Sequence, residues 1–222
     1  DRHRKGVDSW KKVLKIRPDE PEAHLAIGRW HESLGQWQEA RDHLDQCVIL
    51  APRNAEAWML LGSCLHTLHK PGKALEALKR SVELDPTLVR GYMRLANLHR
   101  ELSQTWLAVK ASEAALHLRP RDPYILSNLG NAWLDLGQSE QAIEFYTRSL
   151  EILPDAPTTH SNMIFALQYR SEISRQEIAH AHREWGRKFG TGVPRVHSAK
   201  GVNPDNDLPM RVGFISADFR YH

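Results

Sequence analysis

The apolar positions of residues 122–155 follow the helical period twice, with one interruption between the two runs. The first apolar face has the spacing i, i+3, i+4 and i+7 and consists of Leu126, Leu129, Gly130 and Trp133. The pattern stops at 136–137, and a second face follows through Ala142, Tyr146 and Leu150. Pro154 ends the second run, because proline lacks an N–H and its ring clashes with the preceding turn. The stretch predicts a helical hairpin in which the small residues Gly130 and Ala142 allow two helices to approach closely.

The same pattern recurs every 34 residues. Steps of 34 back from Pro154 give Pro120, Pro86, Pro52 and Pro18, and the same steps from Ala142 give Ala108, Ala74, Ala40 and Gly6. Helix–turn–helix units of 34 residues with this pattern of small residues and prolines are tetratricopeptide repeats. The sequence therefore predicts an all-α, right-handed tetratricopeptide superhelix of about five and a half repeats over residues 1–189.

The two ends of the chain differ from the regular units. The first repeat has only its second helix, with Trp10 at the bulky packing position, so we expect the chain to be part of a longer protein. The last hairpin begins at Thr158, and Ser174 and Glu177 form a capping box at its second helix, but no proline closes it. We expect an atypical, capping hairpin.

The residues after this hairpin have another character. Residues 190–209 are rich in glycine and proline and indicate a linker between domains. The nearly continuous apolar run at 210–216 is typical of a buried strand in a parallel sheet. We expect residues 210–222 to be the beginning of an α/β domain that is truncated after its first β-strand.

Composition limits the classes of partner and compartment. Hydrophobic residues make up 41%, and no apolar run approaches the ~20 residues that a transmembrane helix requires, so no membrane partner is expected. The formal charge is +3, with 30 basic and 27 acidic residues, which argues against a dedicated nucleic-acid surface. The two cysteines are Cys47 and Cys64, and Cys47 falls in a column of small packing residues. Buried thiols without a disulfide framework favour a reducing, cytoplasmic compartment.

The first helices of stacked repeats line a concave wall, so polar side chains on that wall are candidate binding residues. Asn128 and Asn162 occupy the same repeat position, and an amide can pair with a peptide backbone of any sequence. The alternative is that both are ordinary solvated or capping asparagines. Arg90 and Arg94 are one turn apart and either bind an acidic peptide or form a solvated charged stripe.

Metal binding is not indicated by the sequence. His66 and His69 lie on adjacent turns, but no third ligand converges with them in the sequence.

The last segment carries a longer motif. RVGFISADFRYH at 211–222, together with HSNMIFALQY at 160–169 and HREWGRKFG at 182–190, resembles the junction between repeats and catalytic region in the O-GlcNAc transferase family. The resemblance is closest to the bacterial SPINDLY-like members. It covers the whole chain in architecture, but only the final dozen residues of the catalytic part.

This resemblance implies an activity and its site residues. The family transfers N-acetylglucosamine from UDP-GlcNAc to a Ser or Thr hydroxyl of a protein acceptor that lies in the concave groove. It implies that Asn128 and Asn162 belong to an asparagine ladder and that His222 is the active-site histidine, considered as a general base. Ala26, Leu60 and Arg94 occupy the earlier ladder positions, so any ladder here is short. Some SPINDLY relatives use GDP-fucose instead, and the sequence does not decide the donor.

Two function classes remain open at this level. The first is the acceptor-recognising part of a protein O-glycosyltransferase, in which case we expect residues 1–222 alone to bind acceptors without catalysing transfer and without holding a cofactor. The second is a non-catalytic scaffold that binds an acidic C-terminal tail. That clamp needs Lys and Asn on successive first helices, whereas the equivalent positions hold Leu25, Arg29, Leu60, Arg90 and Arg94. The sequence indicates no oligomeric state.

Overall fold

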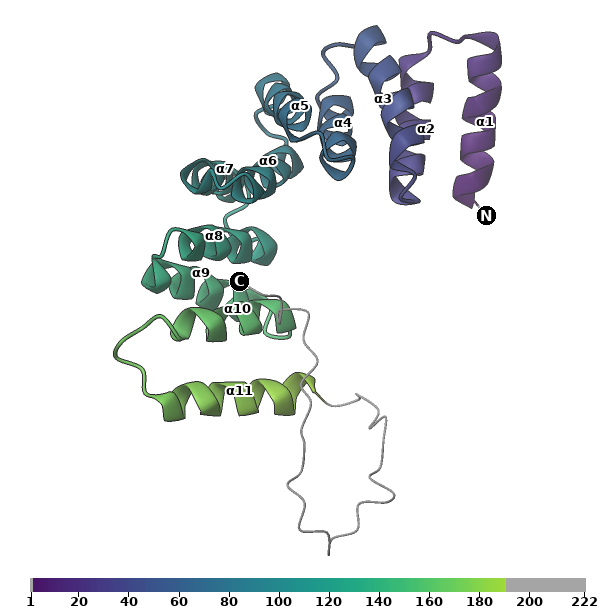
Figure 1. Ribbon diagram of the computed structural model, residues 1–222. Helices are drawn as coiled ribbons and strands as arrows, with labels where there is room; N and C mark the ends of the chain where they lie inside the picture. The colour runs from purple at the N-terminus through teal and green to yellow at the C-terminus, as the bar shows by residue number, and fades with distance from the viewer. Residues whose placement is uncertain (1, 191–222) are drawn as a thin grey trace, which may run out of the picture.

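The computed structural model describes residues 2–190 of the chain, and the side chains from residue 6 onward. These residues form eleven α-helices and no strand (Figure 1). The helices are α1 (Arg2–Ile16), α2 (Pro21–Ser33), α3 (Trp37–Leu50), α4 (Ala55–Thr67), α5 (Pro71–Leu84), α6 (Val89–Glu101), α7 (Thr105–Leu118), α8 (Pro123–Asp135), α9 (Ser139–Ile152), α10 (Pro157–Leu167) and α11 (Arg175–Phe189). The linker at 190–209, apart from Gly190, and the strand expected at 210–216 lie outside the described residues.

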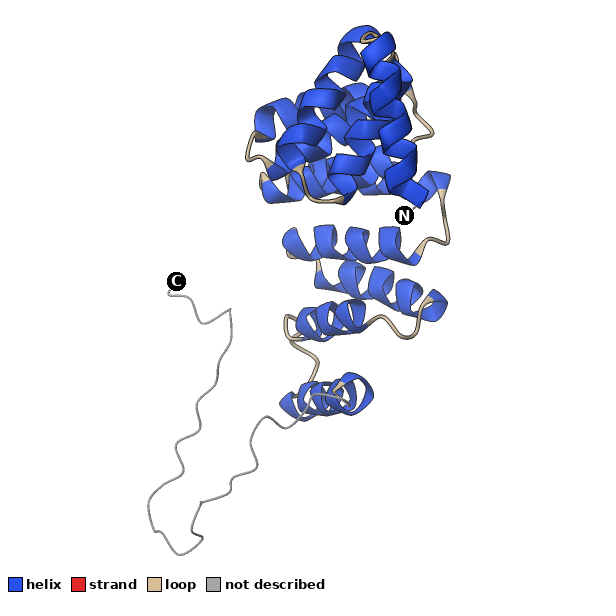
Figure 2. Cartoon of the chain, turned by 90° about the vertical axis from the view of Figure 1, so that its right-hand side faces the viewer, coloured by secondary structure: helices blue, strands red, loops and turns tan. Residues whose placement is uncertain are grey.

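The helices stack as one unpaired helix followed by five hairpins. We call the first helices of the hairpins the inner helices, namely α2, α4, α6, α8 and α10, and each of them contacts its neighbours in this series. Within the described chain, the outer helices α3, α5, α7 and α9 contact only inner helices. The stack therefore curves, with α5, α7 and α9 on the outside of the arc (Figure 1), and Figure 2 shows its layers from the side. The expectation of five and a half repeats is confirmed. We use "inner face" for the surface of the inner helices that points away from the outer ones.

Three hairpins are held by a large side chain that lies against a glycine. A Cβ placed on Gly28 would lie 2.8 Å from Leu44, and one on Gly62 would lie 2.7 Å from Leu78. In the hairpin of α8 and α9 the Gly130 backbone meets the fully buried ring of Tyr146. The recurrent glycine therefore marks a close approach of two helices, as the sequence pattern predicted.

The turns inside four hairpins share one backbone conformation. Gly35 and Gly137 have φ values of 71° and 75°, and His69 and Ser103 at the same repeat position have 55° and 56°. Glycine adopts this left-handed conformation without steric cost, whereas other residues are strained there. The hairpin geometry is thus preserved even where the sequence lacks the glycine.

The last hairpin packs less tightly than the others. Helix α11 contains no buried residue, and its start is fixed by the expected capping box, in which Ser174 Oγ accepts a hydrogen bond from the Glu177 backbone N–H. Trp185 Nε1 donates to the Pro157 carbonyl over 3.1 Å, and Lys188 pairs with Asp155 over 3.0 Å. The last hairpin is therefore held mainly by contacts at its two ends.

No helix among residues 2–190 is long and apolar enough to cross a bilayer.

Candidate functional site

The inner face is closed over α4. Helix α4 buries most of its circumference, including Met59, Leu60 and Ser63, which would face the groove in an open superhelix. Arg94 of α6 reaches across α4 to Glu32 of α2, with 3.5 Å between guanidinium and carboxylate. Leu60 occupies the repeat position of Asn128 and is only 1% exposed. No groove for a ligand is therefore open over α4.

Charges in the middle of the inner face are paired between neighbouring inner helices. His66 Nε2 lies 2.6 Å from a Glu101 oxygen, and Arg100 Nε donates to Asp135 over 2.7 Å. Arg94 thus forms an ion pair with Glu32, and Arg100 forms one with Asp135. Arg90, in contrast, is exposed and has no ion pair or hydrogen bond of its side chain among the described residues. In the same part of the chain, no group of three or more His, Cys, Asp or Glu side chains could hold a metal ion.

Two cavities open on the C-terminal half of the inner face, each of about 390 Å³. The first lies between α6 and α8 and is lined by Asn97, Arg100, Glu101, Asn128 and Asp135. The second lies between α8 and α10, and its lining includes Ser127, Asn128, Asn131, Thr159 and Asn162. Both predicted asparagines therefore lie at these cavities, and Asn128 forms a wall of both.

The amides differ in the hydrogen bonds that they already make. Asn128 is half-buried and makes no hydrogen bond within residues 2–190. Asn162 Nδ2 donates over 2.9 Å to Asn131 Oδ1, which also accepts from the Tyr146 hydroxyl over 2.7 Å. This leaves Asn131 Nδ2 as a donor and Asn162 Oδ1 as an acceptor. Tyr146 is buried, which raises the pKa of its phenol and keeps it a donor.

Sequence reasoning missed Asn131. The signal was available, since Asn131 follows Asn128 by three residues on the same helical face, and Asn97 is its equivalent one repeat earlier. The hydrogen bond from Asn162 to Asn131 joins two neighbouring inner helices, and residue spacing in the sequence could not predict it.

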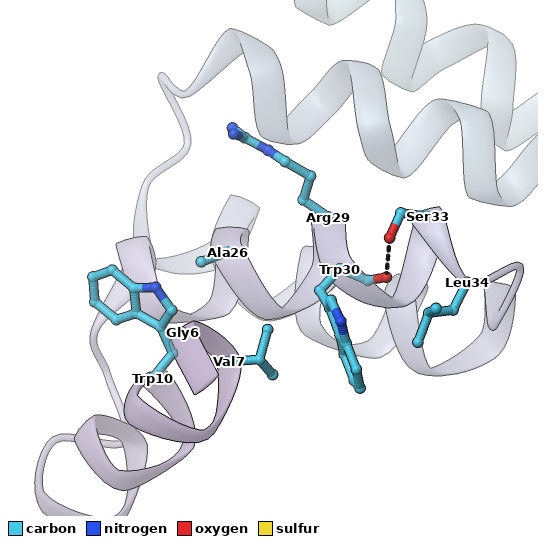
Figure 3. Close-up of a pocket in the computed structure, with 8 residues that line it drawn as sticks. All are labelled: Gly6, Val7, Trp10, Ala26, Arg29, Trp30, Ser33 and Leu34. Carbon is cyan, nitrogen blue, oxygen red and sulfur yellow. Dashed lines mark hydrogen bonds between the residues drawn. The ribbon is translucent and has the colours of Figure 1, made fainter. Parts of the chain in front are cut away.

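A larger pocket of about 670 Å³ lies at the N-terminal end between α1 and α2 (Figure 3). Trp10 on its wall stands at the repeat position of Leu44 and Tyr146, which pack against glycines of their own hairpins, yet Trp10 is 36% exposed. The Arg29 and Ser33 side chains at this pocket already have partners, because Arg29 pairs with Glu56 and Ser33 Oγ donates to the Trp30 carbonyl. The pocket is the uncovered packing face of a half repeat, and its chemistry points to no ligand.

Three histidines gather beside it between α2 and α3. His24 and His43 face each other with 3.1 Å between their Nδ1 atoms, and the ring of His31 stacks on His43 with centroids 5.9 Å apart. Burial and the two neighbouring imidazoles hold the pKa of His43 below its usual value.

Burial raises the pKa of Cys47 to about 11 and that of Cys64 to about 12. Both are free and buried, in agreement with the small packing position predicted for Cys47. His222, the predicted catalytic residue, lies outside the described residues.

Comparison with known proteins supports the repeat architecture. Family models described as "Tetratricopeptide repeat" match residues 25–88 and 123–156. The described fold is a tetratricopeptide-repeat superhelix. No curated protein matches the chain in sequence.

Several solved tetratricopeptide proteins have a similar fold. MamA has a TM-score of 0.63 and 25% identity, with 67% of this chain and 86% of that chain covered. YrrB, described as a TPR protein with an unusual peptide-binding site, has a TM-score of 0.70 and 13% identity, covering 84% and 95%. PilF of Pseudomonas aeruginosa has a TM-score of 0.67 and 20% identity, covering 84% and 78%. The two below 25% identity support the fold alone.

Proposed function

We propose that the inner face from α6 to α10 binds an extended polypeptide through its backbone. The observation that carries this proposal is Asn128, a half-buried amide that borders two cavities and has no partner within the described residues. An amide supplies both a donor and an acceptor, and a peptide unit in an extended segment presents the complementary pair. A partly buried amide without a partner gains more from a ligand than one already bonded.

The neighbouring amides are held in position before the ligand binds. Asn131 is fixed by the Tyr146 hydroxyl and by Asn162, so its free Nδ2 and the free Oδ1 of Asn162 have defined directions. Fixed side chains lose less conformational entropy on binding than mobile ones. The three asparagines together offer an ordered set of donors and acceptors for a main chain.

A second proposal concerns the reaction for which the inner face would hold the bound polypeptide. We propose that this face presents protein acceptors to an O-GlcNAc-transferase-like region, in keeping with the resemblance of residues 211–222. In that reaction the bond from sugar C1 to the UDP oxygen breaks, and a bond from C1 to the acceptor hydroxyl oxygen forms. The hydroxyl proton passes to a base, and the motif suggests His222 for that role. A scaffold without catalysis would use the same inner face, and the sugar-transfer assay separates the two.

Peptide binding is tested by calorimetry with residues 1–222 and a 13-residue peptide of Ser, Thr, Pro and Val. The proposal expects Asn128→Ala with Asn162→Ala to weaken binding about tenfold, at about 0.7 kcal/mol for each of the two lost hydrogen bonds. The matched control is Gln141→Ala, which removes an exposed amide from the outer helix α9. A peptide N-methylated at alternate residues loses backbone donors and should bind weakly. If the methylated peptide binds as tightly as the unmethylated one, or if Gln141→Ala weakens binding as much as the double substitution does, the proposal is wrong.

The transfer step is tested in a protein that contains this chain together with a nucleotide-sugar-binding lobe. Transfer from UDP-GlcNAc to a long acceptor protein should fall about tenfold in the same double variant, while transfer to a short peptide changes little. Equal losses for both acceptors would instead indicate misfolding or a catalytic role for these asparagines. Residues 1–222 alone should bind the acceptor but not UDP-GlcNAc, and donor binding there would contradict the assignment.

A further inference from the structure

The inner face between α6 and α10 changes in chemistry from one end to the other. It begins with an exposed arginine on α6, continues with the amides on α8 and α10, and ends with two exposed aromatic rings, Phe165 on α10 and Tyr169 in the turn after it. If the proposed peptide binding holds, this gradient specifies which residues the bound segment carries and how far apart they are.

The aromatic end consists of Phe165 and Tyr169. Their side chains are 49% and 64% exposed, and the rings meet edge to face with centroids 5.3 Å apart. Phe165 stands at the repeat position of Asn131, which borders the second cavity, so it faces the same side of the stack. Two adjoining exposed rings that stabilise no core offer a platform for an aliphatic, aromatic or proline side chain.

The basic end is Arg90. Other arginines of the inner face are paired, namely Arg29 with Glu56, Arg94 with Glu32 and Arg100 with Asp135. Arg90 is exposed and has no ion pair within the described residues. Because its charge is not neutralised locally, it favours an acidic group on a ligand. Between Arg90 and the aromatic platform the unpaired groups at the cavities are uncharged, namely the amides and the exposed Tyr124 side chain, and they favour an uncharged stretch.

We infer that the groove selects an extended segment in which an acidic residue lies opposite Arg90 and an apolar residue about seven positions away contacts Phe165 and Tyr169. The spacing follows from helix geometry. Two steps between packed inner helices span ~20 Å, and Phe165 is seven residues beyond the α10 equivalent of Arg90, Thr158, which adds an offset of ~10 Å along the axis. The diagonal of ~22 Å corresponds to about seven residues of extended chain at ~3.3 Å each.

The probes are derivatives of the uncharged Ser/Thr/Pro/Val peptide. One carries a single Asp and a single Phe seven residues apart, and others place the pair three or eleven residues apart or in the reverse order. The inference rests on the proposed function, so the uncharged parent peptide serves as its reference. We expect the peptide with the seven-residue spacing to bind about tenfold more tightly than the parent peptide. The peptide with the three-residue spacing should bind no better than peptides that carry only the Asp or only the Phe.

The matching protein variants are Arg90→Gln and the pair Phe165→Ser with Tyr169→Ser. Each should abolish the advantage of its own anchor, Asp or Phe, and should leave the advantage of the other anchor intact. Arg53→Gln in a loop and Trp106→Ser on the outer helix α7 are the matched controls, since both residues are exposed. If the parent binds but spacing has no effect, the two-anchor inference is wrong and the backbone site remains. If no peptide binds at all, the proposed function itself fails.

Discussion

The close approach inside the α8–α9 hairpin predicts a large effect of one methyl group. In Gly130→Ala, the new Cβ would lie 2.6 Å from Cε1 and 2.7 Å from Cδ1 of Tyr146. The ring is fully buried and its hydroxyl is bonded to Asn131, so it has no room to withdraw without losing that bond. Overpacking and the displaced hydrogen bond together cost ~2–4 kcal/mol, and the better helix propensity of alanine offsets ~1 kcal/mol. We expect a net loss of ~1–3 kcal/mol.

The assay is urea denaturation by circular dichroism, together with amide exchange in α8 and α9. The control is Gly186→Ala in α11, where a Cβ meets nothing within 4 Å and should stabilise the helix by about 0.5–1 kcal/mol. Opposite signs for the two substitutions are the expected result. If Gly130→Ala were as stable as the parent protein, the ring would have free space, and the explanation of the repeat's glycine column would be wrong.

Three further results are expected. The lowered pKa of His43 means that the unfolded chain binds more protons than the folded one, so the contribution of His43 to the free energy of unfolding is full above about pH 6.5 and decreases as the pH falls below it. In denaturation curves His43→Asn should flatten this pH dependence, whereas His117→Gln at an exposed position should leave it unchanged. Ser103→Gly should raise the free energy of unfolding by about 0.5–1 kcal/mol, because Ser103 has a φ of 56° where Gly137 supplies glycine, and an unchanged midpoint would contradict strain there. Ser174→Ala should speed amide exchange in α11 about fivefold through loss of its N-cap, and unchanged exchange would show that packing alone holds this helix.

The repeat architecture could be predicted because its causes are local and recur. Three features are visible as spacing in the sequence: the proline after each outer helix from α1 to α9, the small residue at each close approach and the Ser174–Glu177 cap. The position of Trp10 in the bulky packing column was visible for the same reason, and the structure shows it on the uncovered face of α1.

The shape of the inner face could be predicted only in part. Arg90 and Arg94 look alike in the sequence, yet Arg94 pairs with Glu32 across an intervening helix, while Arg90 has no ion pair within residues 2–190. That difference depends on the curvature of the stack, which is the sum of several helix crossing angles and is not encoded at any single position. The same curvature buries Leu60 and brings Asn162 to Asn131. Equivalent repeat positions therefore have different environments along one superhelix.

The most direct test of the account is the behaviour of the asparagine side chains themselves on peptide binding. In NMR spectra of the ¹⁵N-labelled chain, the NH₂ signals of Asn128 and Asn131 should shift when the uncharged Ser/Thr/Pro/Val peptide is added. Those of Asn54, whose side chain caps α4 by accepting from the Ala57 N–H, should stay in place and serve as the internal control. Saturating peptide that leaves Asn128 and Asn131 unchanged, or that shifts only residues of the outer helices, would contradict backbone recognition on the inner face.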